Sequence, residues 1–361
     1  MDLCIRSHQV RTDRERDGRT DQSPRSTGTT NPGERTTDKP KIALYWCASC
    51  GGCEEATVDL AERILDLTNL VDIVFWPIAL DFKEEDVEKL PDGAITASLI
   101  NGGIRVTEHD KMVKLLRRKS KLVVAYGACS AWGGVPGLAN LYSREELISL
   151  VYRDVPSVDN PGKVVPQNRT ILDGAELELP EVFPRLIPID QAIDVDYYVP
   201  GCPPTADVTW KAVEILLSGK LPPKGSVIGA SEKSLCDECP LNETKPEKIL
   251  IQDLKRPHQV IPDPEKCLLT QGLLCLGPAT RGGCTALCVK ARMPCTGCFG
   301  PLDPVSDYGT KAASFIASII DFNDEESVQR VIDALPDPVG TFYRYTLASS
   351  RLGGRIMGGT R

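Results

Sequence analysis

The chain has 361 residues, of which 25% are charged, and its formal net charge is −8. An acidic balance argues against a nucleic-acid-binding protein, because such proteins neutralise phosphates with Lys and Arg. No run approaches the roughly 20 apolar residues that a membrane-spanning helix needs. The sequence therefore predicts no nucleic-acid partner and no membrane span.

The N-terminal extension, residues 1–38, is rich in Thr, Arg, Asp, Gly and Ser and almost free of apolar side chains. Such a segment cannot bury enough apolar surface to offset its ordering entropy, so we expect it to be disordered. It contains neither the apolar centre of a secretory signal nor a twin-arginine motif before an apolar stretch. We therefore expect a cytoplasmic protein, in which disulfides are rare.

From Lys41 onward, short apolar runs alternate with helical patterns. Strands are predicted at 41–46, 71–78, 94–102, 121–129 and 196–202, and helices at 54–67, 109–119 and 205–217. Strands that alternate with helices form a parallel sheet covered on both faces. The order predicts an α/β fold, a flavodoxin-like doubly wound domain over residues 39–225.

The segment 226–305 contains much Cys, Gly and Pro and shows little periodicity. It has too few apolar side chains for a core of its own, and metal–thiolate bonds can hold such a segment together. We expect it to form a loop-rich domain. Helical patterns at 307–320 and 325–335 then lie in a helical C-terminal tail over residues 306–361.

Cysteine is the most informative residue type, with 14 in the chain. Cys50, Cys53, Cys129 and Cys202 follow predicted strands, and ligands bind where the carboxyl ends of parallel strands meet. Four thiolates at that edge fit a [4Fe–4S] cluster, while a zinc site and buried structural thiols are the alternatives. Cys47 precedes the set in a CxxCxxC run and competes for a place in it.

A second group of cysteines crowds into the predicted loop-rich domain. Its members are Cys236, Cys239, Cys267, Cys275, Cys284, Cys288, Cys295 and Cys298. Eight thiolates make two four-ligand sites, and the simplest division is sequential. Zinc ribbons usually show two compact CxxC pairs for each ion. The cysteines here are not spaced in that way, which favours iron–sulfur clusters over zinc.

Six segments carry a resemblance to a known family. WCASCGGCEE, AYGACSAWGGVPG and VPGCPPTADV resemble the proximal-cluster motifs of [NiFe]-hydrogenase small subunits. CDECP, RPHQVIPDPEKCLLTQGLLCLGPATRGGC and PCTGCFGPLD resemble the C-terminal cluster domain of that family. The likeness covers about residues 40–305. It is strongest for the cytosolic methyl-viologen-reducing group, which passes electrons to heterodisulfide reductase through a small ferredoxin-like subunit.

The resemblance implies three [4Fe–4S] clusters. The proximal cluster would be held by Cys50, Cys53, Cys129 and Cys202, the medial by Cys284, Cys288, Cys295 and Cys298, and the distal by Cys236, Cys239, Cys267 and Cys275. Periplasmic relatives have His at the position of Cys236 and Pro at that of Cys288. Both departures indicate all-cysteine [4Fe–4S] clusters, and four thiolates suit a low potential because His ligation raises it.

By this resemblance the chain is an oxidoreductase subunit, the electron-transfer small subunit of a cytosolic [NiFe] hydrogenase. A large subunit would hold the Ni–Fe centre that splits H2. A ferredoxin-like or diaphorase subunit, with heterodisulfide reductase beyond it, would accept the electrons. No residue of this chain would be catalytic.

Three other functions compete with this interpretation. One is an H2-sensing or redox-carrier subunit without turnover. Another is the small subunit of an NAD(P)- or deazaflavin-coupled hydrogenase. The related small subunit of NADH:quinone oxidoreductase has only the proximal-type cluster, and adjacent cysteines in place of Cys50-x2-Cys53. The eight C-terminal cysteines argue against that last function.

Two carboxylates directly follow the first cysteine pair. Glu54 and Glu55 could relay protons towards the nickel site, but a Glu at a helix start ordinarily stabilises the helix dipole. The sequence does not choose between the two residues. No GxGxxG follows a strand and no Walker A motif occurs, so no nucleotide site is predicted.

Overall fold

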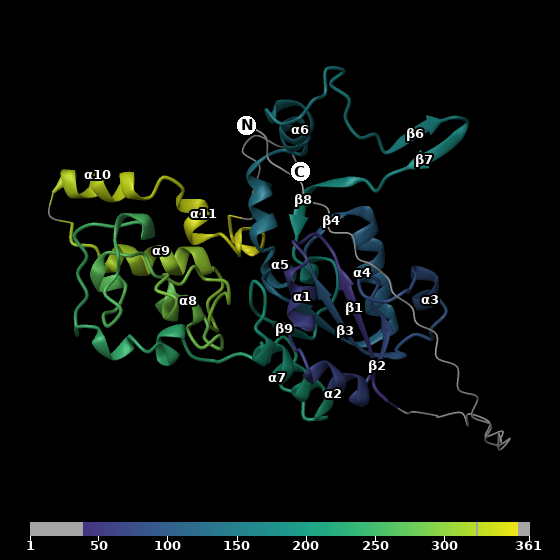
Figure 1. The fold of residues 1–361 in the computed structure, drawn as a ribbon, viewed down its shortest axis with the longest axis horizontal. Coiled ribbons are helices and arrows are strands. Elements are labelled where there is room, and N and C mark those ends of the chain that lie inside the picture. The colour runs from purple at the N-terminus through teal and green to yellow at the C-terminus, as the bar shows by residue number, and fades with distance from the viewer. Residues whose placement is uncertain (1–38, 323, 353–361) are drawn as a thin grey trace, which may run out of the picture. The chain divides into compact units, whose positions relative to one another are not determined.

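The computed structural model describes residues 39–322 and 324–352, which belong to one compact unit (Figure 1). The expectation that residues 1–38 are disordered therefore lies outside the described residues. Within these two ranges no helix combines the length and the apolar character that a membrane span requires.

A five-stranded parallel sheet forms the centre of the first half of the chain. Its strands are β1 (Lys41–Trp46), β2 (Asp72–Phe75), β3 (Ile95–Asn101), β5 (Ser120–Tyr126) and β9 (Tyr197–Val199). Their order across the sheet is β2-β1-β3-β5-β9. This is the 2-1-3-4-5 order of flavodoxin-like folds. The predicted fold class is confirmed.

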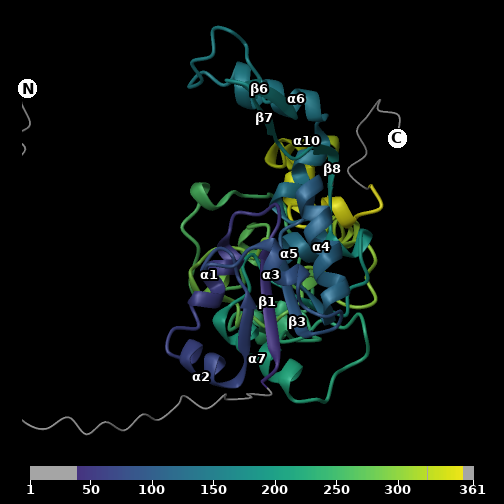
Figure 2. The same cartoon turned by 90° about the vertical axis from the view of Figure 1, so that its right-hand side faces the viewer.

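Helices cover both faces of this sheet, as Figure 2 shows. They include α1 (Gly52–Val58), α2 (Arg63–Leu70), α3 (Glu84–Glu88), α4 (Thr107–Lys119), α5 (Ala128–Trp132) and α7 (Ala206–Leu217). Alternate residues of β1 enter different cores, since Leu44 packs with Leu67 and Val213 while Tyr45 packs with Leu116. Two apolar layers therefore hold the sheet, one against α2 and α7 and the other against α4.

The single helix predicted over 54–67 is wrong, because two helices occupy this stretch. The helix is interrupted between α1 and α2, where Ala61 has a left-handed φ of 51°. On either side of the break Leu60 and Leu67 are buried, whereas Leu65 is exposed.

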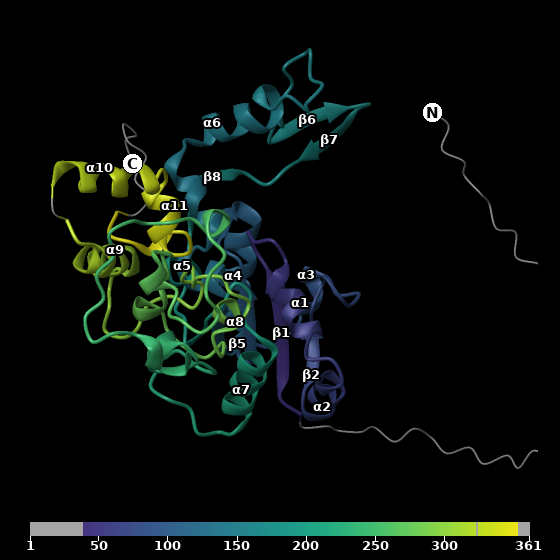
Figure 3. The ribbon, with the colours of Figure 1, turned by 60° about the vertical axis from the view of Figure 1, so that its left-hand side comes forward.

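Between β5 and β9 the chain makes an excursion that the sequence analysis did not anticipate. It contains α6 (Arg144–Ser149), the antiparallel hairpin β6 (Arg169–Leu172) and β7 (Ala175–Glu178), and β8 (Val182–Ile187), which pairs with β4 (Ile104–Val106). The hairpin can be followed in Figure 3, and every residue of its two strands is exposed.

The cysteine-rich segment is built of short 3₁₀ turns and one helix, α8 (Leu287–Lys290). Three helices follow it, namely α9 (Tyr308–Ile319), α10 (Glu325–Ala334) and α11 (Pro338–Phe342). Leu269 and Leu276 from the segment share one core with Ile316 of α9 and Leu347. The loop-rich segment thus completes its core with the helices that follow it. The domain boundaries drawn at residues 225 and 305 stay predictions.

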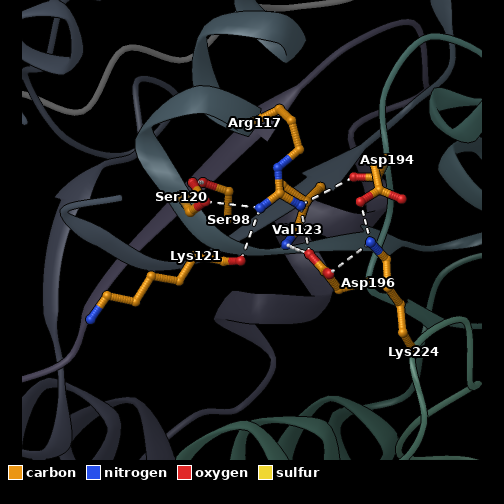
Figure 4. A network of polar contacts seen from close by, with 8 residues as sticks. All are labelled: Ser98, Arg117, Ser120, Lys121, Val123, Asp194, Asp196 and Lys224. Carbon is orange, nitrogen blue, oxygen red and sulfur yellow. Dashed lines mark hydrogen bonds and ion pairs between the residues drawn. The ribbon is translucent and has the colours of Figure 1, made fainter. Parts of the chain in front are cut away.

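A polar network clamps the amino-terminal ends of β5 and β9, at the edge of the sheet away from the cysteines (Figure 4). Arg117 donates to Asp196 Oδ2 at 2.6 Å, and Val123 N donates to the same oxygen at 2.8 Å. Arg117 also donates to the carbonyls of Ser120 and Lys121. One guanidinium therefore joins α4 to two neighbouring strands.

Candidate functional site

The loops that follow β1, β5 and β9 bring four thiols together. Burial raises the pKa of Cys53, and the neighbouring thiols of Cys129, Cys202 and Cys50 raise it further. Burial together with Cys202 and Cys50 raises the pKa of Cys129 to about 12. Each of the four is thus within electrostatic reach of the others. Thiols in such a place stay protonated unless a cation compensates their charge.

Cys47 lies apart from this proximal set. Its side chain packs in the core on the α4 side of the sheet, whereas Cys53 packs in the core on the other side. Burial raises the pKa of Cys47, and the next contribution comes from Glu108 rather than from a proximal thiol. Strand β1 and the loop after it therefore point two nearby cysteines into different environments.

Glycines leave open the space next to the proximal sulfurs. A Cβ on Gly127 would lie 2.3 Å from Cys53 Sγ, and a Cβ on Gly134 would lie 2.3 Å from Cys129 Sγ. Both glycines have positive φ, at 88° and 57°, a conformation that residues with a side chain rarely adopt. Gly52 N also donates to Cys50 Sγ at 3.4 Å. Four gathered thiols, two of them beside glycines that leave room at sulfur, fit a cluster that needs backbone N–H groups close to sulfur.

Four thiols of the C-terminal segment form a distal set. Burial raises the pKa of Cys275 to about 11, with further increases from Cys236 and Cys267. Burial also raises the pKa of Cys236; Lys245 opposes this rise, and Cys239 and Cys267 add to it. The four side chains line one cavity together with Leu235, Lys245 and Leu269.

The other four thiols form a medial set. Burial raises the pKa of Cys298 to about 12, and Cys284 and Cys288 contribute to the increase. Burial raises the pKa of Cys295; among the thiols, Cys275 of the distal set contributes most to this rise and Cys298 contributes less. The sequential division of the eight cysteines stays a prediction: Cys298 neighbours Cys284 and Cys288, whereas Cys295 neighbours thiols of both groups.

The medial set lies between the other two. Cys298 lies close to Cys202, a member of the proximal set, because the thiol of Cys202 raises the pKa of Cys298 and its backbone N–H lowers it. On the other side, Cys295 N donates to Sγ of Cys275, a member of the distal set, at 3.3 Å. The medial set is therefore adjacent to both of the others, so the three sets follow one another in a row, and a backbone N–H to sulfur hydrogen bond joins the medial and distal sets.

None of the thirteen described cysteines forms a disulfide. Over residues 39–322 and 324–352, no group of three or more His, Cys, Asp or Glu side chains forms a site for a single metal ion.

The two carboxylates beside Cys53 have different surroundings. Glu54 is buried, and its Oε1 accepts a hydrogen bond from Asn101 Nδ2 at 2.5 Å while Trp76 Nε1 donates to its Oε2. Burial raises the pKa of Glu54, and the two hydrogen bonds partly oppose this. Glu55 is exposed. The proton relay stays a prediction, and only Glu54 has the buried position for it.

The sequence analysis missed Asn101, the buried last residue of β3 and the hydrogen-bond partner of Glu54. The available signal was its position, since a polar residue at the carboxyl end of a parallel strand lies where ligands bind.

Comparison with known proteins shows which family combines this sheet with these cysteines. Over 88% of its length the chain is 43% identical to the iron–sulfur subunit of an F420-non-reducing hydrogenase from Archaeoglobus profundus, of which the match covers 98%. This chain belongs to that family of hydrogenase iron–sulfur subunits. It is therefore the small subunit of a [NiFe] hydrogenase, as the sequence motifs predicted.

Other relatives of this hydrogenase subunit agree. A subunit of the F420-non-reducing hydrogenase of Methanothermobacter thermautotrophicus is 36% identical, and the match covers 87% of this chain and 96% of that protein. A subunit of an F420-non-reducing hydrogenase from Methanocaldococcus jannaschii is 39% identical over 85% of this chain and 94% of its own length. The family model "NADH ubiquinone oxidoreductase, 20 Kd subunit" matches residues 50–216, which include the proximal set and stop before the other two.

Solved structures of hydrogenases are also similar to this subunit. An NAD+-reducing [NiFe] hydrogenase chain is 32% identical, and the match covers 51% of this chain and 94% of that one with a TM-score of 0.44. A [NiFeSe] hydrogenase chain from Desulfovibrio vulgaris Hildenborough is 18% identical, over 74% and 96% of the two chains, with a TM-score of 0.48.

Proposed function

We propose that this small subunit conducts electrons one at a time between the Ni–Fe centre of the large subunit and an acceptor subunit, through three [4Fe–4S] clusters. The observation that carries the proposal is the row of three four-thiol sets, joined by the Cys202–Cys298 and Cys275–Cys295 contacts. A continuous row of this kind suits electron transfer through the chain, whereas a single terminal cluster would serve a simple carrier.

The clusters would supply reversible one-electron chemistry at low potential. The side chains of the three sets would bind iron as thiolates, and the glycines beside Cys53 and Cys129 would let backbone N–H groups approach sulfur. Burial of the thiols would keep water away and thereby influence the potential. The chain's own contribution is thus ligation, spacing and exclusion of solvent.

We place the large-subunit contact around the loops of Cys50, Cys129 and Cys202. Cys50 is exposed beside the buried Cys53. Apolar side chains are exposed on the same loops, among them Trp46 at 36% and Val135 at 45%. A partner that covers these side chains would also shield the proximal cluster from water.

We further propose a cytoplasmic complex in which a ferredoxin-like or diaphorase subunit accepts the electrons, with heterodisulfide reductase as the terminal partner. The names of the relatives describe hydrogenases that do not reduce F420, which weighs against the deazaflavin-coupled alternative. Kinetics distinguish the proposed function from that of a sensing subunit without turnover. The purified complex should reduce a dye steadily under H2, whereas a sensor should not.

The three-cluster proposal is tested by analysis of the anaerobically purified chain. We expect about twelve iron and twelve sulfide per chain, without nickel, because each [4Fe–4S] cluster holds four of each. The isolated chain should not oxidise H2, and activity should appear only with the large subunit. Zinc in place of iron, or iron near four per chain, would contradict the proposal.

A further inference from the structure

One buried amide holds both flanks of the Cys50-x2-Cys53 loop. Asn101 has 1% of its surface exposed. Its Oδ1 accepts a hydrogen bond from Ser49 Oγ at 2.9 Å, and its Nδ2 donates to Glu54 Oε1 at 2.5 Å. Ser49 is the residue immediately before Cys50, and Glu54 is the residue immediately after Cys53. The amide therefore brackets the two cysteines.

The same residue also ties this loop to the sheet. Asn101 Nδ2 donates to the carbonyl of Tyr45 at 3.2 Å, and Cys47 N donates to the carbonyl of Asn101 at 2.8 Å. An amide offers two N–H donors and one oxygen, and all three groups are engaged. The orientation of the amide follows from its partners, because Tyr45 O and Glu54 Oε1 can only accept.

No other side chain meets these demands at this site. Aspartate would keep the bond from Ser49 but has no N–H for Tyr45 or Glu54. Glutamine is longer by one methylene in a closely packed position. Loss of the amide would leave the buried Glu54 carboxylate with only the bond from Trp76, and an under-satisfied buried charge is costly.

We propose that Asn101 is a positioning residue for the proximal cluster: it holds Cys50 and Cys53 at the separation that the cluster needs. This inference rests on the proposed iron–sulfur function. Asn101 fixes the conformation of the loop through hydrogen bonds and does not itself bind iron. Without it, the loop would sample wider conformations and two of the four proximal ligands would bind iron less tightly.

The test compares two buried asparagines of the same domain. Asn101→Ala removes the bracket. Asn140→Ala is the matched control, because Asn140 is also buried and bonds backbone groups of Leu186 at 2.8 Å, but brackets no cysteine. Each variant is purified anaerobically with its large subunit. Iron per chain is measured, together with the EPR signals and the midpoint potentials of the reduced clusters.

We expect Asn101→Ala to fall to about eight iron, or to keep about twelve with a shifted midpoint for one cluster only. The medial and distal signals should stay as in the wild type, and Asn140→Ala should match the wild type throughout. Unchanged iron and midpoints in Asn101→Ala would overturn the inference. Equal iron loss in Asn140→Ala would overturn it as well, since a general loss of stability would then explain both.

A milder variant decides the matter if Asn101→Ala does not fold. Ser49→Ala removes one bond of the bracket, together with the bond that Ser49 Oγ accepts from Gly51 N. We expect a several-fold faster loss of iron to a chelator. An unchanged rate would overturn the inference. A wild-type chain with only four iron would contradict the three-cluster proposal instead. The role of Asn101 would still be tested in that case, by comparing how tightly wild type, Ser49→Ala and Asn101→Ala hold those four iron atoms.

Discussion

At the scale of single residues, neighbours in sequence have different roles because the strand and its loop turn them to different sides. Cys47 enters a closed apolar core while Cys50 stands exposed beside the other proximal thiols. The motif alone left both as candidates. The structure separates them by environment, and this separation can be tested by substitution.

Cys50→Ser should uncouple H2 oxidation from every acceptor, whereas Cys47→Ser should be mild. The first change removes a proposed proximal ligand, so we expect iron to fall from about twelve towards eight per chain. The second substitutes a thiol that lies apart from the set. Iron analysis and H2-dependent dye reduction of both variants provide the measurement. Equal loss in the two would show that the proximal assignment is wrong.

Cys288→Pro should convert the medial cluster to a [3Fe–4S] form of higher potential. Cys288 is exposed and lies in the first turn of α8, where proline is tolerated because the N–H needs no helical acceptor. A cluster that loses one thiolate readily loses the iron held by it. EPR of the oxidised variant should show a three-iron signal at about eleven iron per chain.

Dye reduction by this variant should persist, since the row of clusters stays unbroken, but transfer to a low-potential acceptor should slow. A variant that keeps about twelve iron and gives no three-iron signal would exclude Cys288 as a ligand. The division of the eight C-terminal cysteines would then have to be redrawn.

The candidate ligands could be found from sequence because Cys is rare and its chemistry is narrow. The partners of those ligands could not. The choice between Glu54 and Glu55, and the bracket made by Asn101, depend on residues about fifty positions away that meet only across the sheet. Spacing along a chain gives no information about such contacts.

At the scale of elements, strongly apolar strands were predictable and irregular connections were not. Each strand of the central sheet lies within a predicted run or begins one residue from it, because buried parallel strands are nearly continuous in apolar residues, although β2 and β9 are much shorter than predicted. The break at Ala61 and the β6–β7 hairpin were missed. The first depends on a left-handed residue that is not glycine, and the second is a hairpin whose strands are wholly exposed and bury no apolar face.

The clamp between α4, β5 and β9 gives a stability prediction with a defined pH dependence. Burial alone would raise the pKa of Asp196, but hydrogen bonds from Arg117 and Val123 N, with the charges of Arg117 and Lys224, hold it below its ordinary value. This stabilisation is therefore present above the unfolded-state pKa of about 3.9. It is lost as the pH falls through the lower folded-state pKa.

We expect Asp196→Asn to lower the free energy of unfolding by about 1–3 kcal/mol at pH 7, because charged hydrogen bonds of a buried group are lost. The difference from wild type should shrink below about pH 4. Urea denaturation of the anaerobically purified chain across this pH range is the measurement. Asp207→Asn, in an exposed pair with Arg63, is the control and should cost under about 1 kcal/mol. A difference that is constant with pH would contradict the argument.

At the scale of the whole molecule, two kinds of cohesion operate in the one compact unit. The sheet rests on two apolar layers, while the cysteine-rich segment combines a core shared with α9 and proposed bonds to iron. Removal of iron should therefore affect the two parts unequally. The amino-acid pattern indicated this contrast, although not that α9 and Leu347 would complete the second core.

Chelation of iron under anaerobic conditions should increase backbone hydrogen exchange in residues 236–298 far more than in β1, β3 and β5. The reason is that metal–thiolate bonds stabilise segments poor in regular structure. Mass spectrometry before and after chelation gives the comparison. Equal increases in both parts would show that the clusters are not what stabilises the cysteine-rich segment.

The junction between Cys295 and Cys275 has a kinetic consequence. A proposed ligand of the medial cluster donates its own backbone N–H to the sulfur of a proposed distal ligand, so a single amide would span the gap that an electron crosses there. That gap is set when the polypeptide folds and does not vary with the encounter of separate molecules. The rates of electron transfer between the clusters should consequently not depend on solvent viscosity. Only the final electron transfer, to an acceptor that diffuses or moves, should slow in glycerol.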